Sequence, residues 1–207
     1  VHHATISIAD GSMTRLTSGD GTHELEFSPD GEHYIDRWSR VDRPPVHELR
    51  RSSDGGLVTT LAIADHARLL ESGWQEPERF VAKARDGETD IWGVIVRPRD
   101  FDPTKTYPVI EHIYAGPHGH FVPKSFSQRW RMREIADRGF IVVQIDGMGT
   151  NWRSKAFHDV AWKNLGDSGF PDRIAWMKAA AKNRPWMNLD RVGVYGGSAG
   201  GQSALRA

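Results

Sequence analysis

Three local patterns follow one another near residue 198 and limit the folds that this chain can adopt. Residues 191–195 read Arg-Val-Gly-Val-Tyr and favour a β-strand. A glycine-rich run, 196–201, follows at once, and residues 202–205 can begin a helix. The run matches the spacing G-x-S-x-G, with a serine at the centre. We therefore expect a strand, a tight turn and a helix, with Ser198 at the tip of the turn.

This spacing has a steric reason. A serine that projects from a sharp turn needs flanking positions without side chains, so Gly196 and Gly200 clear the space while Ser198 takes a strained backbone conformation. The N-terminus of the following helix favours negative charge close by. Ser198 is therefore a candidate nucleophile, and a plain glycine-rich turn is the alternative.

The part of the chain before this turn alternates between apolar runs and helical patterns. Residues 108–114 and 140–145 are apolar and rich in β-forming residues, and both are predicted strands. The alternation of three predicted strands with two predicted helices indicates a mostly parallel sheet covered by helices. Residues 80–84 and 91–96 flank Asp86-Gly87 as a predicted hairpin. The first helix is indicated by Trp130, Met132, Ile135 and Ala136, ending near Gly139, and the second by Ile174, Met177 and Ala181.

Residues 1 to about 62 have a different pattern of short strands and turns. Leu25 and Phe27 alternate with glutamates before the turn sequence Ser-Pro-Asp-Gly at 28–31. Further strands are predicted at 34–38, 46–49 and 57–61, separated by Pro44-Pro45 and by Asp54-Gly55-Gly56. Four antiparallel strands in sequence suit one blade of a β-propeller. An isolated meander packed on the second half is the alternative.

Composition excludes several classes of function. The 207 residues hold 27 Lys and Arg against 27 Asp and Glu, so a strongly basic nucleic-acid binder is not indicated. The absence of cysteine excludes thiol catalysis, thiolate metal sites and disulfides, but it leaves the compartment open, whether periplasmic, secreted or cytoplasmic. No targeting sequence and no apolar run of membrane-spanning length is visible. Gly147-Met148-Gly149 lacks the third glycine of a dinucleotide motif, so we expect no cofactor.

Several segments together resemble one family. The sequence is similar to the prolyl oligopeptidase-type serine peptidases, within them to the dipeptidyl peptidase IV-like branch. The resemblance implies an α/β-hydrolase fold, incomplete at its C-terminus, preceded by the last part of a β-propeller. It divides the chain into the end of a propeller (1–63), a linker (64–78) and the first part of a catalytic domain (79–207). The segments that carry it are 27–31, Ser39-Arg40, Pro44-Pro45, Tyr107-Pro108-Val109, Tyr114-Ala115-Gly116-Pro117, Asp146-Gly147-Met148-Gly149 and 196–201.

The resemblance also implies roles for two residues beside the serine. In that family the tyrosine of the Tyr-Ala-Gly-Pro segment donates its hydroxyl to the oxyanion hole, and the N–H after the serine is the second donor. Here these are Tyr114 and Ala199. Independently, Tyr114 ends a predicted parallel strand, where open α/β sheets place their sites, and a phenol is a competent donor. A packing role for Tyr114 is the alternative that the residues alone favour.

Other polar residues are expected to be structural. His112, His118 and His120 lack an acidic or thiol partner at a ligand spacing, so we expect no metal site there. Asp146 follows a predicted strand in a turn environment, and Asp167 lies near the start of a helix, where an acid suits the helix dipole. Both are interpreted as turn or structural carboxylates.

The catalytic acid and base are expected outside this sequence. In α/β-hydrolases the order is serine, then Asp or Glu, then His, and all 10 histidines precede Ser198. We therefore expect the triad Asp and His beyond Ala207, a chain that is a fragment, and a segment that alone is inactive and poorly stable. In dipeptidyl peptidase IV the residue after the serine is a tyrosine that helps to line the proline pocket. Here that residue is Ala199, so we expect a different wall of the pocket at this position.

The predicted function is hydrolysis of short peptides through an acyl-enzyme on Ser198. An esterase of the same fold shares that chemistry, and a hydrolase-like binding protein without activity is a third alternative. The expected partner is a peptide substrate, with no nucleic acid and no membrane segment in this chain, and the resemblance leaves room for a homodimer of the full-length protein.

Overall fold

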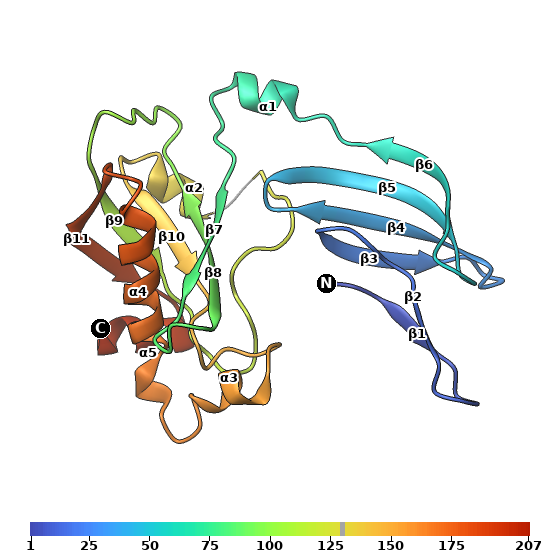
Figure 1. The fold of residues 1–207 in the computed structure, drawn as a ribbon. Helices are drawn as coiled ribbons and strands as arrows, with labels where there is room; N and C mark the ends of the chain where they lie inside the picture. The colour runs from blue at the N-terminus through green and yellow to red at the C-terminus, as the bar shows by residue number, and fades with distance from the viewer. Residues whose placement is uncertain (129–130) are drawn as a thin grey trace. The chain divides into compact units, whose positions relative to one another are not determined.

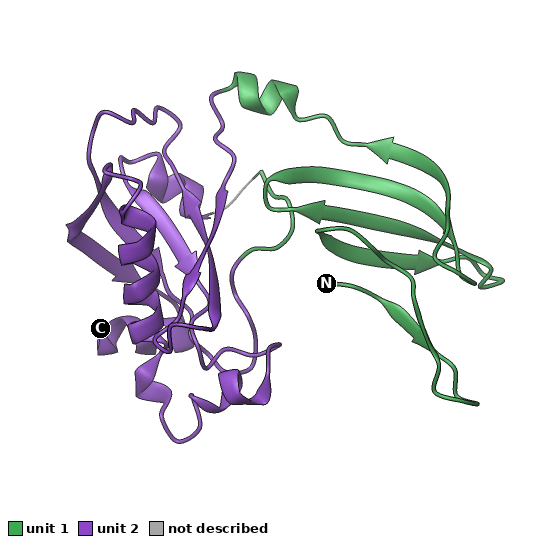
Figure 2. Cartoon of the chain, in the orientation of Figure 1, with its two compact units in different colours: residues 1–72, 123–128 green, residues 73–122, 129–207 purple. Residues whose placement is uncertain are grey.

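The computed structural model describes residues 1–128 and 131–207. The chain divides into two compact units, one formed by residues 1–72 and 123–128 and the other by 73–122 and 129–207 (Figure 2). Among the described residues, no helix combines the length and the apolar content needed to cross a bilayer.

The first unit contains a four-stranded antiparallel sheet, in agreement with the strands predicted from alternation. The sheet has the order β3-β4-β5-β6. β5 begins earlier than predicted, because Pro44 and Pro45 lie inside it rather than before it. Proline is tolerated there because the β4–β5 register shifts near Arg40, at the start of the strand, while the Pro45 carbonyl still accepts a hydrogen bond from the Ala64 N–H. The strands are β3 (Thr22–Phe27), β4 (His33–Arg40), β5 (Arg43–Arg51) and β6 (Leu57–Ile63).

Two further strands of the first unit were not predicted. β1 (Ala4–Ile6) and β2 (Met13–Arg15) form an antiparallel hairpin of their own. All six residues are exposed, so the sequence carries no alternation of buried and exposed positions there. A five-residue helix, α1 (Ala67–Glu71), lies within residues 64–78, which are interpreted from the sequence as a linker.

The second unit is built on a five-stranded mixed sheet (Figure 1). Its strand order is β11-β9-β10-β8-β7; β9, β10 and β11 are parallel, and β8 and β7 run antiparallel at one edge. The predicted parallel core is confirmed, with the predicted hairpin added to it. The strands are β7 (Glu78–Lys83), β8 (Asp90–Val96), β9 (Tyr107–His112), β10 (Ile141–Ile145) and β11 (Met187–Tyr195).

Helices cover both faces of this sheet. The chain moves along the sheet in one direction from β9 to β10, and in the other direction from β10 past β9 to β11. Right-handed crossovers therefore place α2 and α4 on opposite faces of the sheet. Ile141, Val143 and Ile145 of β10 accordingly share one apolar cluster with Trp176 of α4. The helices are α2 (Arg131–Ala136), α3 (Lys155–Asp159), a short 3-10 helix η1 (Leu165–Asp167), α4 (Phe170–Ala181) and α5 (Ala199–Arg206).

Two details of the predicted helices need correction. Ile174, expected on the buried stripe of α4, is 47% exposed, and the buried face is displaced by about one position. Trp176 sets that face: it is fully buried over Gly93, where a Cβ would come within 2.6 Å of its ring. In the other helix, Trp130 lies outside the described residues, and α2 ends at Ala136, three residues before Gly139.

Candidate active site

Ser198 stands at the sharp turn between β11 and α5. Its backbone has φ 54° and ψ −125°, a positive-φ conformation that residues with a Cβ rarely adopt. β11 ends at Tyr195, α5 begins at Ala199, and Ser198 itself is exposed. The strand, turn and helix expected from the sequence are therefore present, and the turn presents the serine to solvent.

The flanking glycines are required by close backbone approach. A Cβ at Gly196 would overlap the carbonyl groups of Gly200 and Ile113. A Cβ at Gly200 would overlap the Ile113 carbonyl as well. The turn packs this tightly against the end of β9, so side chains are excluded at both positions.

Tyr114 lies beside this turn. The Ile113 N–H donates to the Tyr195 carbonyl at 2.9 Å, so the ends of β9 and β11 are joined one residue before Tyr114. The Tyr114 ring atom Cδ2 is 3.3 Å from the position of a Cβ on Gly200. The half-buried ring also packs on Phe121, with 4.2 Å between ring centroids. Two segments separated by more than 80 residues thus meet at one edge of the sheet.

The site occupies a topological switch point of the sheet. β9 and β11 are neighbouring strands. The chain leaves β9 toward α2, on one face of the sheet, and it leaves β11 toward α5. The Ser203 hydroxyl of α5 contacts that of Ser168, just before α4, so α5 lies on the α4 side. Connections that leave adjacent strands on opposite faces open a crevice at their carboxyl ends, where ligands bind in open α/β sheets.

The loop that follows Tyr114 is fastened from two other elements. The Asp146 carboxylate, after β10, accepts hydrogen bonds from the N–H groups of Phe121 (2.8 Å) and Val122 (3.1 Å). The His158 Nε2 donates to the Pro117 carbonyl at 2.8 Å. Asp146 thus acts as a loop anchor, in line with its interpretation as a structural carboxylate.

Comparison with known proteins adds to this geometry. The profile described as "Prolyl oligopeptidase family" matches residues 124–207. Human dipeptidyl peptidase 8 is 28% identical over 100% of this chain and 24% of its own length, and "Probable dipeptidyl-aminopeptidase B" of Emericella nidulans is 31% identical over 95% of the chain and 22% of its own. The solved structure of Porphyromonas gingivalis dipeptidyl peptidase 4 superposes with a TM-score of 0.74 at 30% identity, covering 96% of this chain and 28% of that one.

Residues 124–207 of this chain match the prolyl oligopeptidase family, and the relatives to which nearly the whole chain is similar are named dipeptidyl peptidases. The chain spans about a quarter of the length of the relatives it matches. The family resemblance seen in the sequence is thereby confirmed, and the segment Tyr114–Pro117 that carried part of it is the one that meets the serine turn.

A network of carboxylates in the second unit was not predicted from the sequence. Arg85 donates to Asp167 at 2.6 and 2.8 Å and to the fully buried Asp172 at 2.9 Å. Asp172 in turn accepts the Met148 N–H at 2.9 Å. Hydrogen bonding to Arg85 holds the pKa of Asp167 below its ordinary value. The network ties the loop after β10 to the start of α4, and only the acidic residues near a helix start could have suggested it.

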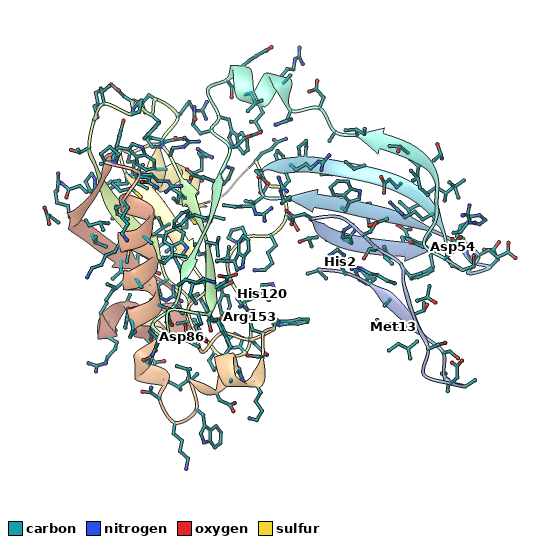
Figure 3. The ribbon with its side chains drawn as sticks, viewed as in Figure 1. His2, Met13, Asp54, Asp86, His120 and Arg153 are labelled. Atoms are coloured by element: carbon teal, nitrogen blue, oxygen red, sulfur yellow. The ribbon has the colours of Figure 1, made fainter. Side chains whose placement is uncertain are left out.

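The three histidines considered as metal ligands lie in different surroundings. His112 stacks on Tyr195 with 4.7 Å between centroids, and burial lowers its pKa. His118 packs edge-on against Tyr114, whereas His120, labelled in Figure 3, packs edge-on against Trp152. Within residues 1–128 and 131–207, no group of three His, Cys, Asp or Glu side chains is arranged to hold a metal ion.

A cavity of about 550 Å³ adjoins the Tyr114 loop. Its walls are mostly apolar, and His118 forms part of them while its ring also contacts Tyr114. Trp162, another wall residue, is 74% exposed. The lining residues are Pro117, His118, Asn151, His158, Asp159, Ala161, Trp162, Lys163 and Leu165.

Proposed function

We propose that the full-length protein is a serine peptidase that hydrolyses short peptides through an acyl-enzyme on Ser198. The observation that carries the proposal is the strained, exposed serine between β11 and α5, packed beside Tyr114 at the switch point of the sheet. The match of residues 124–207 to the prolyl oligopeptidase family and the dipeptidyl peptidase names of the relatives support the same activity.

In the proposed mechanism the Ser198 hydroxyl attacks the peptide carbonyl and loses its proton to a base. The Tyr114 hydroxyl and the Ala199 N–H, the first of α5, stabilise the oxyanion of the tetrahedral intermediate. Its collapse releases the amine, which takes up the proton, and water then hydrolyses the acyl-enzyme. We propose that the His base and its Asp partner belong to the full-length protein outside these 207 residues.

The proposal extends to the architecture. We infer that residues 1–63 are the end of a β-propeller, that 64–78 link it to the next domain, and that 79–207 begin an α/β-hydrolase domain. The four-stranded antiparallel sheet β3–β6 supports the first assignment, because propeller blades are four-stranded meanders. The turn after β11, with glycines at 196 and 200, supports the last, because this is the nucleophile position of that fold.

The test compares Ser198→Ala with wild type in the full-length protein. The substrates are a dipeptidyl amide and a simple aryl ester, and Ser53→Ala, a change at an exposed turn serine, is the control. We expect wild type and the control to hydrolyse the amide and Ser198→Ala to lose about 10⁶-fold in kcat. Hydrolysis of the ester alone would show an esterase, and hydrolysis of neither would show a binding protein; either result would overturn the proposal.

Tyr114→Phe tests the oxyanion hole separately. Loss of one donor lowers kcat by about 10²- to 10³-fold. Because the donor acts on charge that develops in the transition state, KM should change little. Wild-type kcat in this variant would exclude Tyr114 from the oxyanion hole and leave it a packing residue.

A further inference from the structure

We propose that Arg173, with Ser168 and Ser203, forms a buried hydrogen-bonded chain that holds both oxyanion-hole groups in register. Arg173 is then a positioning residue for the reaction at Ser198. This inference rests on the proposed function and adds to it a group that neither touches the substrate nor lies in the motifs that identify the family.

The first half of the chain runs from Arg173 to Tyr114. Arg173, on α4, is fully buried, and its Nη1 donates to Glu111 Oε1 at 2.6 Å. Its Nη2 donates to the Tyr114 carbonyl at 3.4 Å, and its Nε donates to the Ser168 carbonyl at 2.8 Å. Glu111 is itself 3% exposed and lies on β9, three residues before Tyr114. One planar guanidinium therefore fixes the end of β9 from the adjacent helix.

The second half runs from Ser168 to Ala199. Ser168 has φ 51°, a left-handed conformation for a residue with a Cβ, in which its carbonyl and its hydroxyl meet different partners. Its Oγ lies 3.1 Å from Ser203 Oγ, and the Ser203 hydroxyl donates to the Ala199 carbonyl at 3.0 Å. Ser168 and Ser203 are both buried. The residue whose N–H is the proposed second donor is thus held through its own carbonyl.

The energetics indicate that this arrangement is specific. A buried guanidinium is tolerated only when its charge is paired and its N–H groups are satisfied, which Glu111 and the two carbonyls provide. Such pairs add little net stability over an apolar replacement, but they fix geometry. The two ends of the chain are the backbone carbonyls of Tyr114 and Ala199, which are the two residues that the mechanism uses as donors. A misplacement of about 1 Å in such groups costs about 10²-fold in rate.

The experiment measures kcat and KM of the full-length protein for Arg173→Lys, alone and in the Tyr114→Phe background. Lysine keeps the charge but cannot make the forked contacts of arginine. We expect Arg173→Lys to lower kcat by about 10- to 100-fold with little change in KM. In the Tyr114→Phe background the same change should lower kcat by a smaller factor, because only one of the two donors that it misplaces, the Ala199 N–H, is still present.

Arg184→Lys is the matched control. Arg184 follows α4 and pairs with Glu78, remote from the serine turn, so this variant should keep wild-type kcat. Glu111→Gln and Ser203→Ala repeat the test if Arg173→Lys does not fold. Glu111→Gln removes the negative charge that pairs with Arg173, and Ser203→Ala removes the hydroxyl that donates to Ala199; each change nearly keeps the size of the side chain. Glu111→Gln should show the same non-additivity with Tyr114→Phe.

The outcomes separate this inference from the proposed function. An unchanged kcat in a folded Arg173→Lys or Glu111→Gln variant would overturn it, as would the same fold-loss with and without the Tyr114 hydroxyl, which indicates a merely structural role. If Ser198→Ala retains wild-type activity, the proposed function itself fails. If Ser198→Ala is inactive while the Arg173 variants behave as wild type, only the positioning role fails.

Discussion

Replacing Ser198 by glycine should make the protein more stable than replacing it by alanine, although both changes remove the proposed nucleophile. The reason is backbone strain: at φ 54° and ψ −125°, a Cβ is unfavourable, and alanine keeps it while glycine does not. Because neither variant has the hydroxyl, the comparison isolates the conformation of residue 198 from its chemistry.

The magnitude follows from two opposing terms. Strain of this kind costs about 1–3 kcal/mol. Glycine loses about 0.5–1 kcal/mol more than alanine to conformational entropy on folding. At the midpoints of these ranges Ser198→Gly is more stable than Ser198→Ala by about 1 kcal/mol, and at their limits by at most about 2.5 kcal/mol.

Native-state hydrogen exchange in the full-length protein can measure this difference. Peptides that span β11 and α5 (187–206) report the local free energy of opening. Ala204→Gly, within α5, is the control and should lower that free energy by about 1 kcal/mol, because its backbone is helical. If Ser198→Gly proves no more stable than Ser198→Ala, the backbone at 198 is unstrained and the geometry assigned to the turn is wrong.

Three further predictions concern the second unit. Trp176→Ala should lower the free energy of unfolding by about 3–5 kcal/mol in denaturant titrations, because its ring is fully buried over Gly93; a loss below about 1 kcal/mol would contradict that packing. Gly200→Ala should cost about 1–3 kcal/mol, because the added methyl meets the Ile113 carbonyl, and a variant as stable as wild type would show that the turn has room. Asp167→Asn should lower the free energy of unfolding at pH 7 and do so progressively less below about pH 4. The pKa of Asp167 is lower in the folded than in the unfolded protein, so its ionised carboxylate contributes full stability above the unfolded pKa. That contribution is lost as the pH falls through the folded pKa. Unfolding free energies that differ from wild type by the same amount at pH 7 and pH 3 would refute the role of its pairing with Arg85.

The turn around Ser198 could be predicted because its evidence is local. A strand rich in valine, two glycines at a fixed spacing and a following helix stand within 15 residues of sequence. The antiparallel strands β3 to β6 were accessible for the same reason, through alternation and turn residues. The hairpin of β1 and β2 was not, since no side chain in it is buried.

The neighbours of Ser198 depend on pairing between distant segments. Tyr114 lies beside the turn because β9 and β11 are adjacent in the sheet, and strand order is not written in any local pattern. The Arg173 chain joins four segments in the same way. The sequence indicates it in one way: Arg173 is a charged residue three and seven positions before Trp176 and Ala180, a spacing that places all three on the buried side of α4. Hydrophobicity alone selected Ile174 instead, which is exposed.

The proposed reaction requires the hydroxyl of residue 198 to be a nucleophile. A fluorophosphonate probe applied to the full-length protein, with the adduct located by peptide mass spectrometry, tests this requirement. We expect one modified peptide, with the phosphonyl group on Ser198, slower labelling in Tyr114→Phe, and none at this position in Ser198→Ala. A folded, peptide-hydrolysing protein that carries the adduct on another serine, or none at all, would contradict it.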